Sequence, residues 1–381
     1  MSTRSVPASR RDPASPPGAG LAVLAVWLIT RLLMVVVAQV IMARTGRSFT
    51  QVVANWDVQH YQAIAADGYR DPVNMAFFPG LPMLLRAASQ LGVPMELAGV
   101  ILAALGSLLA AWALLRLAGA PAACLWLVAP MGVFTMVGYT EALFAAAAFW
   151  AWERARAGRW AAVGLLAAAA CLLRISGVFL LIGLGLLALL GDGPGWRPPA
   201  WRWRWRALGW LVLPVVVLAG FVVYLHGLSG HWDAWLSAQQ AGWQRGITTP
   251  WQSLRNTLFA VHESAWPAEP TRAWMFRFEI ASVAVGYLTT LGCLIARQWA
   301  RAGYVLSQVV ALSSAYWFMS VNRGVLLWFP LFIGLGAVVD WRPRSGVARV
   351  AWRILLGIFV VADAALMCWW ASLFFRGMWA S

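Results

Sequence analysis

The stretch LAVLAVWLITRLLMVVVAQVIM, residues 21–42, decides the fold of this chain, because it is apolar over a full membrane crossing. A helix needs about 20 apolar residues to cross a hydrocarbon core about 30 Å thick. Similar segments recur as far as Phe375, and 61% of the 381 residues are hydrophobic, 11% are charged and the mean hydropathy is +0.70. This composition excludes a soluble globule and predicts an all-α polytopic membrane protein.

The segment before this first apolar run has a different composition. Residues 1–20 are rich in Pro, Ser and Arg and contain little that can pack, so we expect a disordered cytosolic tail there. The apolar run behind the tail is longer than the core of a signal peptide, and no small-residue cleavage pattern follows it. We therefore expect one integral membrane domain over residues 21–381.

Segment length and hydropathy predict about eleven transmembrane or re-entrant helices. The expected segments are 21–43, 97–117, 120–137, 141–152, 160–172, 178–190, 207–227, 279–296, 304–320, 325–339 and 354–374. Several are shorter than a full crossing, so we expect about nine to thirteen full crossings. Two outer loops, 44–96 and 228–278, are long enough to hold structure, and residues 76–91 and 251–261 predict short helices in the membrane interface.

The arginines predict an orientation. The net charge is +15 and every basic side chain is an arginine, and short loops rich in arginine face the cytoplasm. With the tail inside, the basic loops at 154–159, 196–206, 297–301 and 342–353 all fall on the cytoplasmic side. We expect their partners to be anionic membrane lipids rather than nucleic acid. The use of arginine without lysine indicates a GC-rich bacterial genome and hence a plasma membrane.

The same orientation gathers polar residues from distant segments on the extracytoplasmic side. All four histidines and most acidic residues lie there, which predicts a single extracytoplasmic active site. The four cysteines lie inside apolar segments and predict neither a disulfide framework nor a zinc site. No phosphate-binding glycine loop is present. We therefore expect no metal and no cofactor.

The stretch WDVQHYQAIAADGY at 56–69 places a carboxylate and an imidazole three residues apart, just after the first apolar segment. Asp57 is a candidate general base, and the alternative is that it caps the helix that follows it. His60 is a candidate ligand for a phosphate group or a structural hydrogen-bonding residue. Trp56 and Tyr61, which flank this pair, are expected to support the substrate site.

Two arginines are flanked by long apolar runs. Such a residue is expensive in a membrane and is by default a functional candidate. Arg174 in CLLRISG and Arg323 in MSVNRGVLLWFP are each candidates to bind a lipid-linked phosphate, and the alternative is snorkelling to the interface. Glu141 in GYTEALF stands at the start of an apolar helix, where its charge suits the positive end of the helix dipole. We expect it to support the same site.

Four separated stretches resemble the PIG-V-type mannosyltransferases, the family of GPI mannosyltransferase II within the GT-C superfamily. WDVQHYQAIAADGY with AFFPGLP at 56–82 is similar to the first family pattern, and GYTEALF at 138–144, LRISG at 173–177 and SVNRGVLLWFP at 320–330 follow in the same order. The later motifs depart from the family: Ile175 and Ser176 stand where Pro and Thr often occur, and Asn322 precedes the arginine.

The resemblance implies a GT-C glycosyltransferase fold with a catalytic Asp in the first outer loop, here Asp57, and a polyprenyl-phosphate-mannose donor. We expect Asp57 to act as the base in an inverting transfer to a hydroxyl of a lipid, glycan or protein, with His60, Arg174 and Arg323 holding the donor phosphate. This activity belongs to glycolipid biosynthesis or a related pathway of glycan assembly.

Two other classes of function stay open. A polytopic lipid or solute transporter, or a flippase, would show two matched halves with broken helices at corresponding positions, and the sequence shows no such pairing. A noncatalytic subunit of a glycosyltransferase complex would share the motifs without the activity.

Overall fold

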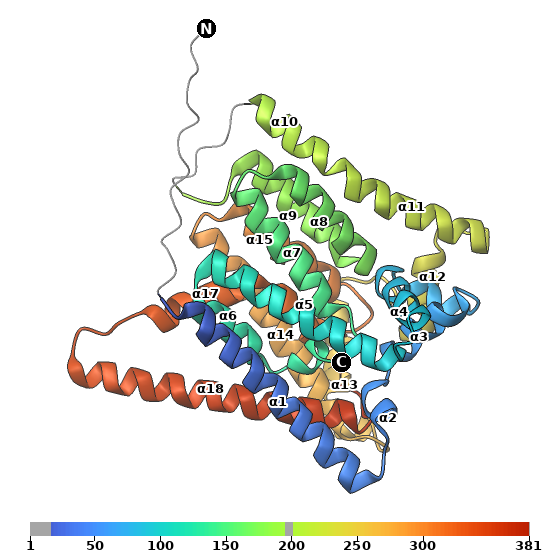
Figure 1. Ribbon diagram of the computed structural model, residues 1–381, viewed down its shortest axis with the longest axis horizontal. Helices are drawn as coiled ribbons and strands as arrows, with labels where there is room; N and C mark the ends of the chain where they lie inside the picture. Colours follow the sequence, from blue (N-terminus) through green and yellow to red (C-terminus); the bar gives the residue numbers. More distant parts are fainter. Residues whose placement is uncertain (1–16, 195–200, 381) are drawn as a thin grey trace.

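The computed structural model describes residues 17–194 and 201–380, and these residues form a bundle of helices with no strand (Figure 1). One isolated bridge pairs Ile247 with Ala315. Most of the predicted tail at 1–20, and the first part of the basic loop at 196–206, lie outside the described residues. The prediction of an all-α chain is confirmed.

Five helices are long and apolar enough to cross a membrane, counting only the described parts of the chain. They are α1 (Ala19–Thr45), α5 (Met95–Ala118), the continuous run Trp203–Ser229 made of α10 (Trp201–Trp210) and α11 (Val212–Ser229), α14 (Thr271–Ile295) and α18 (Gly346–Phe375). A sixth candidate is bent by 69° and consists of α16 (Val321–Gly324) with η4 (Val325–Leu327), followed by α17 (Phe329–Asp340).

The other predicted segments also contain helices, but these are shorter than a straight crossing. They are α6 (Ala120–Leu127), α7 (Glu141–Arg156), α8 (Trp160–Leu173), α9 (Ser176–Leu190) and α15 (Trp299–Ser313). Every predicted segment therefore contains a helix. The number of full crossings stays a prediction, because several of these helices are too short for the assumed thickness.

Small residues set the packing at the centre of the bundle. A Cβ on Gly106 of α5 would lie 2.9 Å from the backbone of Ala142 in α7, and one on Gly99 would lie 2.8 Å from the Cα of Gly138. Membrane helices approach this closely where small side chains meet, since backbone contact replaces the missing hydrophobic drive. The close contact fixes the start of α7, and with it Glu141, against α5.

The two long loops contain short helices that gather at one end of the bundle, and Figure 1 shows α3, α4 and α12 side by side there. The first loop forms α2 (Phe49–Val53), α3 (Asp57–Asp67), η1 (Pro72–Ala76) and α4 (Gly80–Gln90). The second loop forms α12 (Ala234–Trp243), α13 (Pro250–Ala260) and η3 (Glu263–Ala265). Outside these loops, the short helix η2 (Gly132–Thr135) lies between α6 and α7. Helices α4 and α13 confirm the helices predicted over 76–91 and 251–261.

The two loops are joined by hydrogen bonds to a single carbonyl. The indole Nε1 of Trp235 and the amide Nε2 of Gln239, both on α12, donate to the Ala76 oxygen at 3.2 Å each. Residue pairs this far apart in sequence cannot be matched from local pattern. The loops therefore form one structured layer over the helix ends.

The opposite end of the bundle carries a separate set of ion pairs. Asp192 lies 2.7 Å from Arg301 and 3.1 Å from Arg156, and Glu153 pairs with Arg116 at 2.7 Å and with Arg154. Arg154, Arg156 and Arg301 come from loops predicted to share one side of the membrane, and Arg116 lies in the last turn of α5. They lie at the end of α7 away from Glu141, and their assignment to the cytoplasm stays a prediction.

The contact between α5 and α7 predicts a position-dependent effect of adding one methyl group. Gly106→Ala should destabilise the protein by about 1–3 kcal/mol, because the new Cβ meets backbone that cannot move aside. Gly220→Ala in α11 is the matched control, since a Cβ there meets nothing within 4 Å and alanine favours the helix. Thermal unfolding in detergent measures both, and an unchanged midpoint for Gly106→Ala would contradict the packing described.

Candidate functional site

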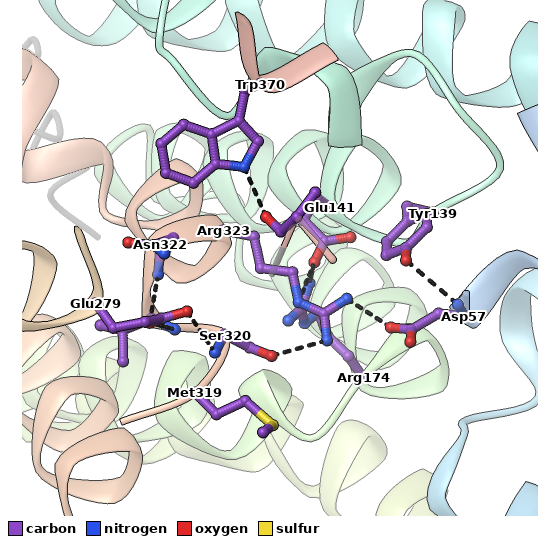
Figure 2. Close-up of polar contacts among 12 residues, drawn as sticks. Asp57, Tyr139, Glu141, Arg174, Glu279, Met319, Ser320, Asn322, Arg323 and Trp370 are labelled. Carbon is purple, nitrogen blue, oxygen red and sulfur yellow. Dashed lines mark hydrogen bonds and ion pairs between the residues drawn. The ribbon is translucent and has the colours of Figure 1, made fainter. Parts of the chain in front are cut away.

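Asp57 is the first residue of α3 and is only 8% exposed. Its carboxylate Oδ2 lies 2.5 Å from Nη1 of Arg323, as Figure 2 shows. The N-cap of α3 is Trp56, whose φ of +56° is unusual for a residue with a side chain. Asp57 therefore does not cap the helix, and its charge is directed across the bundle instead.

Arg323 lies between two carboxylates. Its Nε is 3.6 Å from Oε1 of Glu141, and the same oxygen lies 2.6 Å from Nη1 of Arg174. Glu141 is the first residue of α7 and has no exposed surface. The four predicted residues thus form one chain of charges, Asp57, Arg323, Glu141 and Arg174, and neither arginine snorkels away from the bundle.

Arg245, in the connection between α12 and α13, joins the same site and was not predicted. Its Nη2 donates to the Ser320 hydroxyl at 2.7 Å and to the Met319 carbonyl at 3.3 Å. Burial, together with the nearby Arg323 charge, lowers the pKa of Arg245 to about 10. In the sequence, Arg245 is recognisable only as an arginine in the second long loop, and no motif surrounds it.

Three arginines line one cavity of about 220 Å³. Arg174, Arg245 and Arg323 meet there, while Phe179 and Leu327 are among its apolar walls. The Nε atoms of all three guanidinium groups have no hydrogen-bond partner within the described structure. Arg245 bonds to neutral oxygens and, within the same residues, forms no ion pair with a carboxylate. The cavity is therefore suited to an anion that carries an apolar tail.

A second, smaller cavity of about 30 Å³ lies beside Asp57. It is lined by aromatic side chains that include Trp56, Tyr139 and Trp379, and it has room for about one water molecule. Arg323, Ser320 and Met319 line both cavities, so these residues form the wall between them. The carboxylate lies on one side of this wall and Arg174 and Arg245 lie on the other.

His60 lies outside both cavities. Its ring stacks on Phe77 with centroids 4.8 Å apart and meets the Trp243 ring at its edge, and its Nδ1 is 2.8 Å from Oδ1 of Asn74. The geometry favours the structural role that the sequence left open as an alternative. His60 is therefore not placed to bind a phosphate in the larger cavity.

The predicted supporting residues surround Asp57. Tyr61 is buried against Phe77 and Tyr139, and burial raises its pKa. The Tyr139 hydroxyl accepts the Asp57 N–H at 3.3 Å, and burial raises the Tyr139 pKa well above 10, which keeps it protonated. Trp56 lines the smaller cavity and donates its Nε1 to the Met378 carbonyl at 3.1 Å.

Within the described ranges, no group of three or more His, Cys, Asp or Glu side chains could hold a metal ion. The two acidic residues of the site, Asp57 and Glu141, are each engaged by arginine.

Residues 28–188 match the family model described as Mannosyltransferase (PIG-V). Over these residues the chain is similar to the PIG-V mannosyltransferases. This confirms the resemblance predicted from the four motifs. The matched region contains the first three motifs, with Asp57, Glu141 and Arg174, while Arg245 and Arg323 lie beyond it.

Curated relatives agree with this match. GPI alpha-1,6-mannosyltransferase 2 of Mus musculus is 36% identical over 154 residues, which are 35% of this chain and 31% of the mouse protein. The Homo sapiens protein of the same name is 36% identical over 135 residues, 30% of this chain and 27% of its own length. The similarity thus spans less than a third of either relative.

A solved structure shows the same fold over most of the chain. ArnT from Cupriavidus metallidurans, crystallised with undecaprenyl phosphate, has a TM-score of 0.50 and 16% identity, and the match covers 91% of this chain and 76% of ArnT. At this identity the similarity concerns the fold alone. It confirms the predicted GT-C fold, and with the apolar helices it identifies an integral membrane protein.

The buried chain of charges predicts a large effect at Glu141. Glu141→Gln should destabilise the protein by about 3–5 kcal/mol, because the fully buried carboxylate is shared by two guanidinium groups that are mostly withdrawn from solvent, and both lose their partner. Asp67→Asn is the control: its partner Arg70 is 80% exposed, so the loss should stay below about 1 kcal/mol. Thermal unfolding in detergent compares the two, and equal midpoints would contradict the role of the buried pair.

Proposed function

We propose that this chain is a mannosyltransferase that moves mannose from a polyprenyl-phosphate-mannose donor to a hydroxyl acceptor on the extracytoplasmic side of the membrane. One observation carries the proposal: Arg323 pairs with Asp57 on one side and lines an arginine-rich cavity on the other. The PIG-V match supports the sugar, and the undecaprenyl phosphate in the ArnT crystal supports a lipid-borne phosphate. Nucleotide sugars are scarce outside a cell, so a donor carried by a membrane lipid is chemically suitable there.

The donor phosphate belongs in the larger cavity. Arg174, Arg245 and Arg323 offer N–H groups in the forked geometry that suits phosphate oxygens, and charge-assisted bonds of this kind are the stronger ones. The apolar walls accept the first units of the lipid chain, because covering them removes apolar surface from water. In this arrangement Arg245 takes the place that the sequence assigned to His60.

The candidate base lies in the smaller cavity, across the wall formed by Met319, Ser320 and Arg323. Asp57 engages Arg323 through Oδ2, which leaves Oδ1 for an acceptor hydroxyl. Asp57 takes the hydroxyl proton as the acceptor oxygen forms a bond to the anomeric carbon. The bond from that carbon to the phosphate oxygen breaks, and its electron pair leaves with the polyprenyl phosphate, whose charge the arginines stabilise.

This displacement inverts the anomeric centre. The linkage in the donor is beta, so a single displacement gives an alpha-mannoside, by the same logic as an inverting glycosidase with an alcohol in place of water. The chemistry requires only the side chains named above.

Asp57→Asn tests the base. Mannose transfer by the reconstituted protein should fall at least about a hundredfold, because an amide cannot accept the proton. Polyprenyl phosphate binding should persist, since Asp57 does not line the larger cavity and the asparagine oxygen can still accept a hydrogen bond from Arg323. Asp67→Asn, at the exposed end of the same helix, is the control. Near-normal turnover of Asp57→Asn would remove it from the catalytic role, and no transfer by the unaltered chain would favour a noncatalytic subunit.

Arg245→Ala tests the donor site. The KM for polyprenyl-phosphate-mannose should rise roughly tenfold or more, the effect of losing one charge-assisted hydrogen bond. The matched control is Arg255→Ala in α13, where the guanidinium lies over the Trp251 ring on the exposed surface. Steady-state kinetics with a fixed acceptor measures both variants. Equal KM values would place the phosphate away from Arg245.

A further inference from the structure

We propose that Glu279 is a positioning residue that sets Arg245 and Arg323 for the donor phosphate by holding the turn at residues 320–322. This inference rests on the proposed function and adds a residue that touches neither cavity.

Glu279 lies in α14 with no exposed surface and accepts three consecutive backbone N–H groups. Its Oε1 accepts from Ser320 at 2.9 Å, and its Oε2 accepts from Val321 at 2.7 Å and Asn322 at 3.1 Å. These amides begin α16, where N–H groups have no partner inside the helix. Figure 2 shows Glu279 beside this turn and Arg323 beyond it.

The cap supplied by Glu279 changes what Ser320 can do. A serine at an N-cap normally adopts an extended backbone and bonds its own hydroxyl to the helix N–H groups. Ser320 has a φ of +63° in the left-handed region and makes no such bond. Its hydroxyl instead accepts from Nη2 of Arg245 at 2.7 Å and from Nη2 of Arg323 at 3.1 Å.

The Ser320 hydroxyl therefore holds two like-charged groups at one point. Guanidinium groups repel each other. Arg323 is paired with Asp57 and Glu141, whereas Arg245 forms no ion pair with a carboxylate among the described residues, so Arg245 is the member of the pair prepared for an anion. The strained backbone persists because its surroundings determine it, and strain of this kind is concentrated at binding sites.

A second contact ties the same turn to α14. The Asn322 side chain accepts the Ser282 hydroxyl at 2.9 Å and donates to the Met275 carbonyl at 3.3 Å. Ser282 and Met275 lie about one turn on either side of Glu279 along the helix. Met275, Glu279 and Ser282 of α14 thus all bond to the turn at residues 320–322. Among these three, the Glu279 carboxylate is the group that bonds to the backbone of the turn.

A structural cap and a positioning residue differ in what they affect. A cap alone would change stability, whereas a positioning residue also changes phosphate binding when the fold is intact. Ser320→Gly separates the two, because glycine adopts a positive φ without penalty and removes only the bridging hydroxyl.

The experiment measures undecaprenyl phosphate binding and the donor KM and kcat of the full chain in nanodiscs. Glu279→Gln should bind the lipid phosphate at least tenfold more weakly, because an amide offers one acceptor oxygen and a donor that opposes the turn. Glu279→Asp should recover part of the loss. Ser320→Gly should unfold at no lower temperature than the parent chain and still bind at least fivefold more weakly.

Thr290→Val is the control, since Thr290 is buried in the same helix and bonds only to the Gly286 carbonyl of its own backbone. It should match the parent in binding. Parent-like binding by Glu279→Gln and Ser320→Gly, within twofold, would overturn this inference alone, and Ser320→Gly decides it if Glu279→Gln fails to fold. Absence of binding by the parent chain would overturn the proposed function and this inference together.

Discussion

The ion pair between Asp57 and Arg323 joins segments 266 residues apart, and the arrangement of the site depends on it. A buried charge is stable only with a partner of opposite charge, and removal of either partner leaves the other as an unpaired charge inside the protein. Glu141 is shared between Arg323 and Arg174, so the need for a charged partner also links the start of α7 to the end of α8. Four segments of the bundle are thereby fixed relative to one another.

The two groups of ion pairs lie at opposite ends of helix α7, and this division separates the candidate site from the arginine-rich end. Helix α7 begins at Glu141, in the site, and ends near Arg156, which pairs with Asp192 at the opposite end. Between them lies a core of alanine and aromatic side chains that excludes water. In the proposed function, the chain of the lipid donor lies beside this apolar middle and its phosphate reaches the arginines at one end.

Strained backbone lies next to both members of the central ion pair. Trp56 precedes Asp57 with a positive φ, and Ser320 stands three residues before Arg323 with another. Such conformations persist only where neighbouring contacts impose them. Here those contacts are the hydrogen bond from Trp56 to the C-terminal segment and the carboxylate of Glu279 beneath Ser320. The unusual backbone geometry of the site is thus held by contacts from outside it.

The sequence by itself determined the membrane class, the positions of the helices and four members of the site. Hydropathy identifies segments that can lie in lipid, and a charged residue within an apolar run, such as Arg174 or Arg323, is recognised from the sequence alone. The positions of Arg245 and Glu279 beside Ser320, and the position of His60 away from the cavities, were decided only by tertiary structure. Each depends on contacts across tens of residues, such as Arg245 with Ser320 75 positions away, and packing rather than local pattern selects such partners.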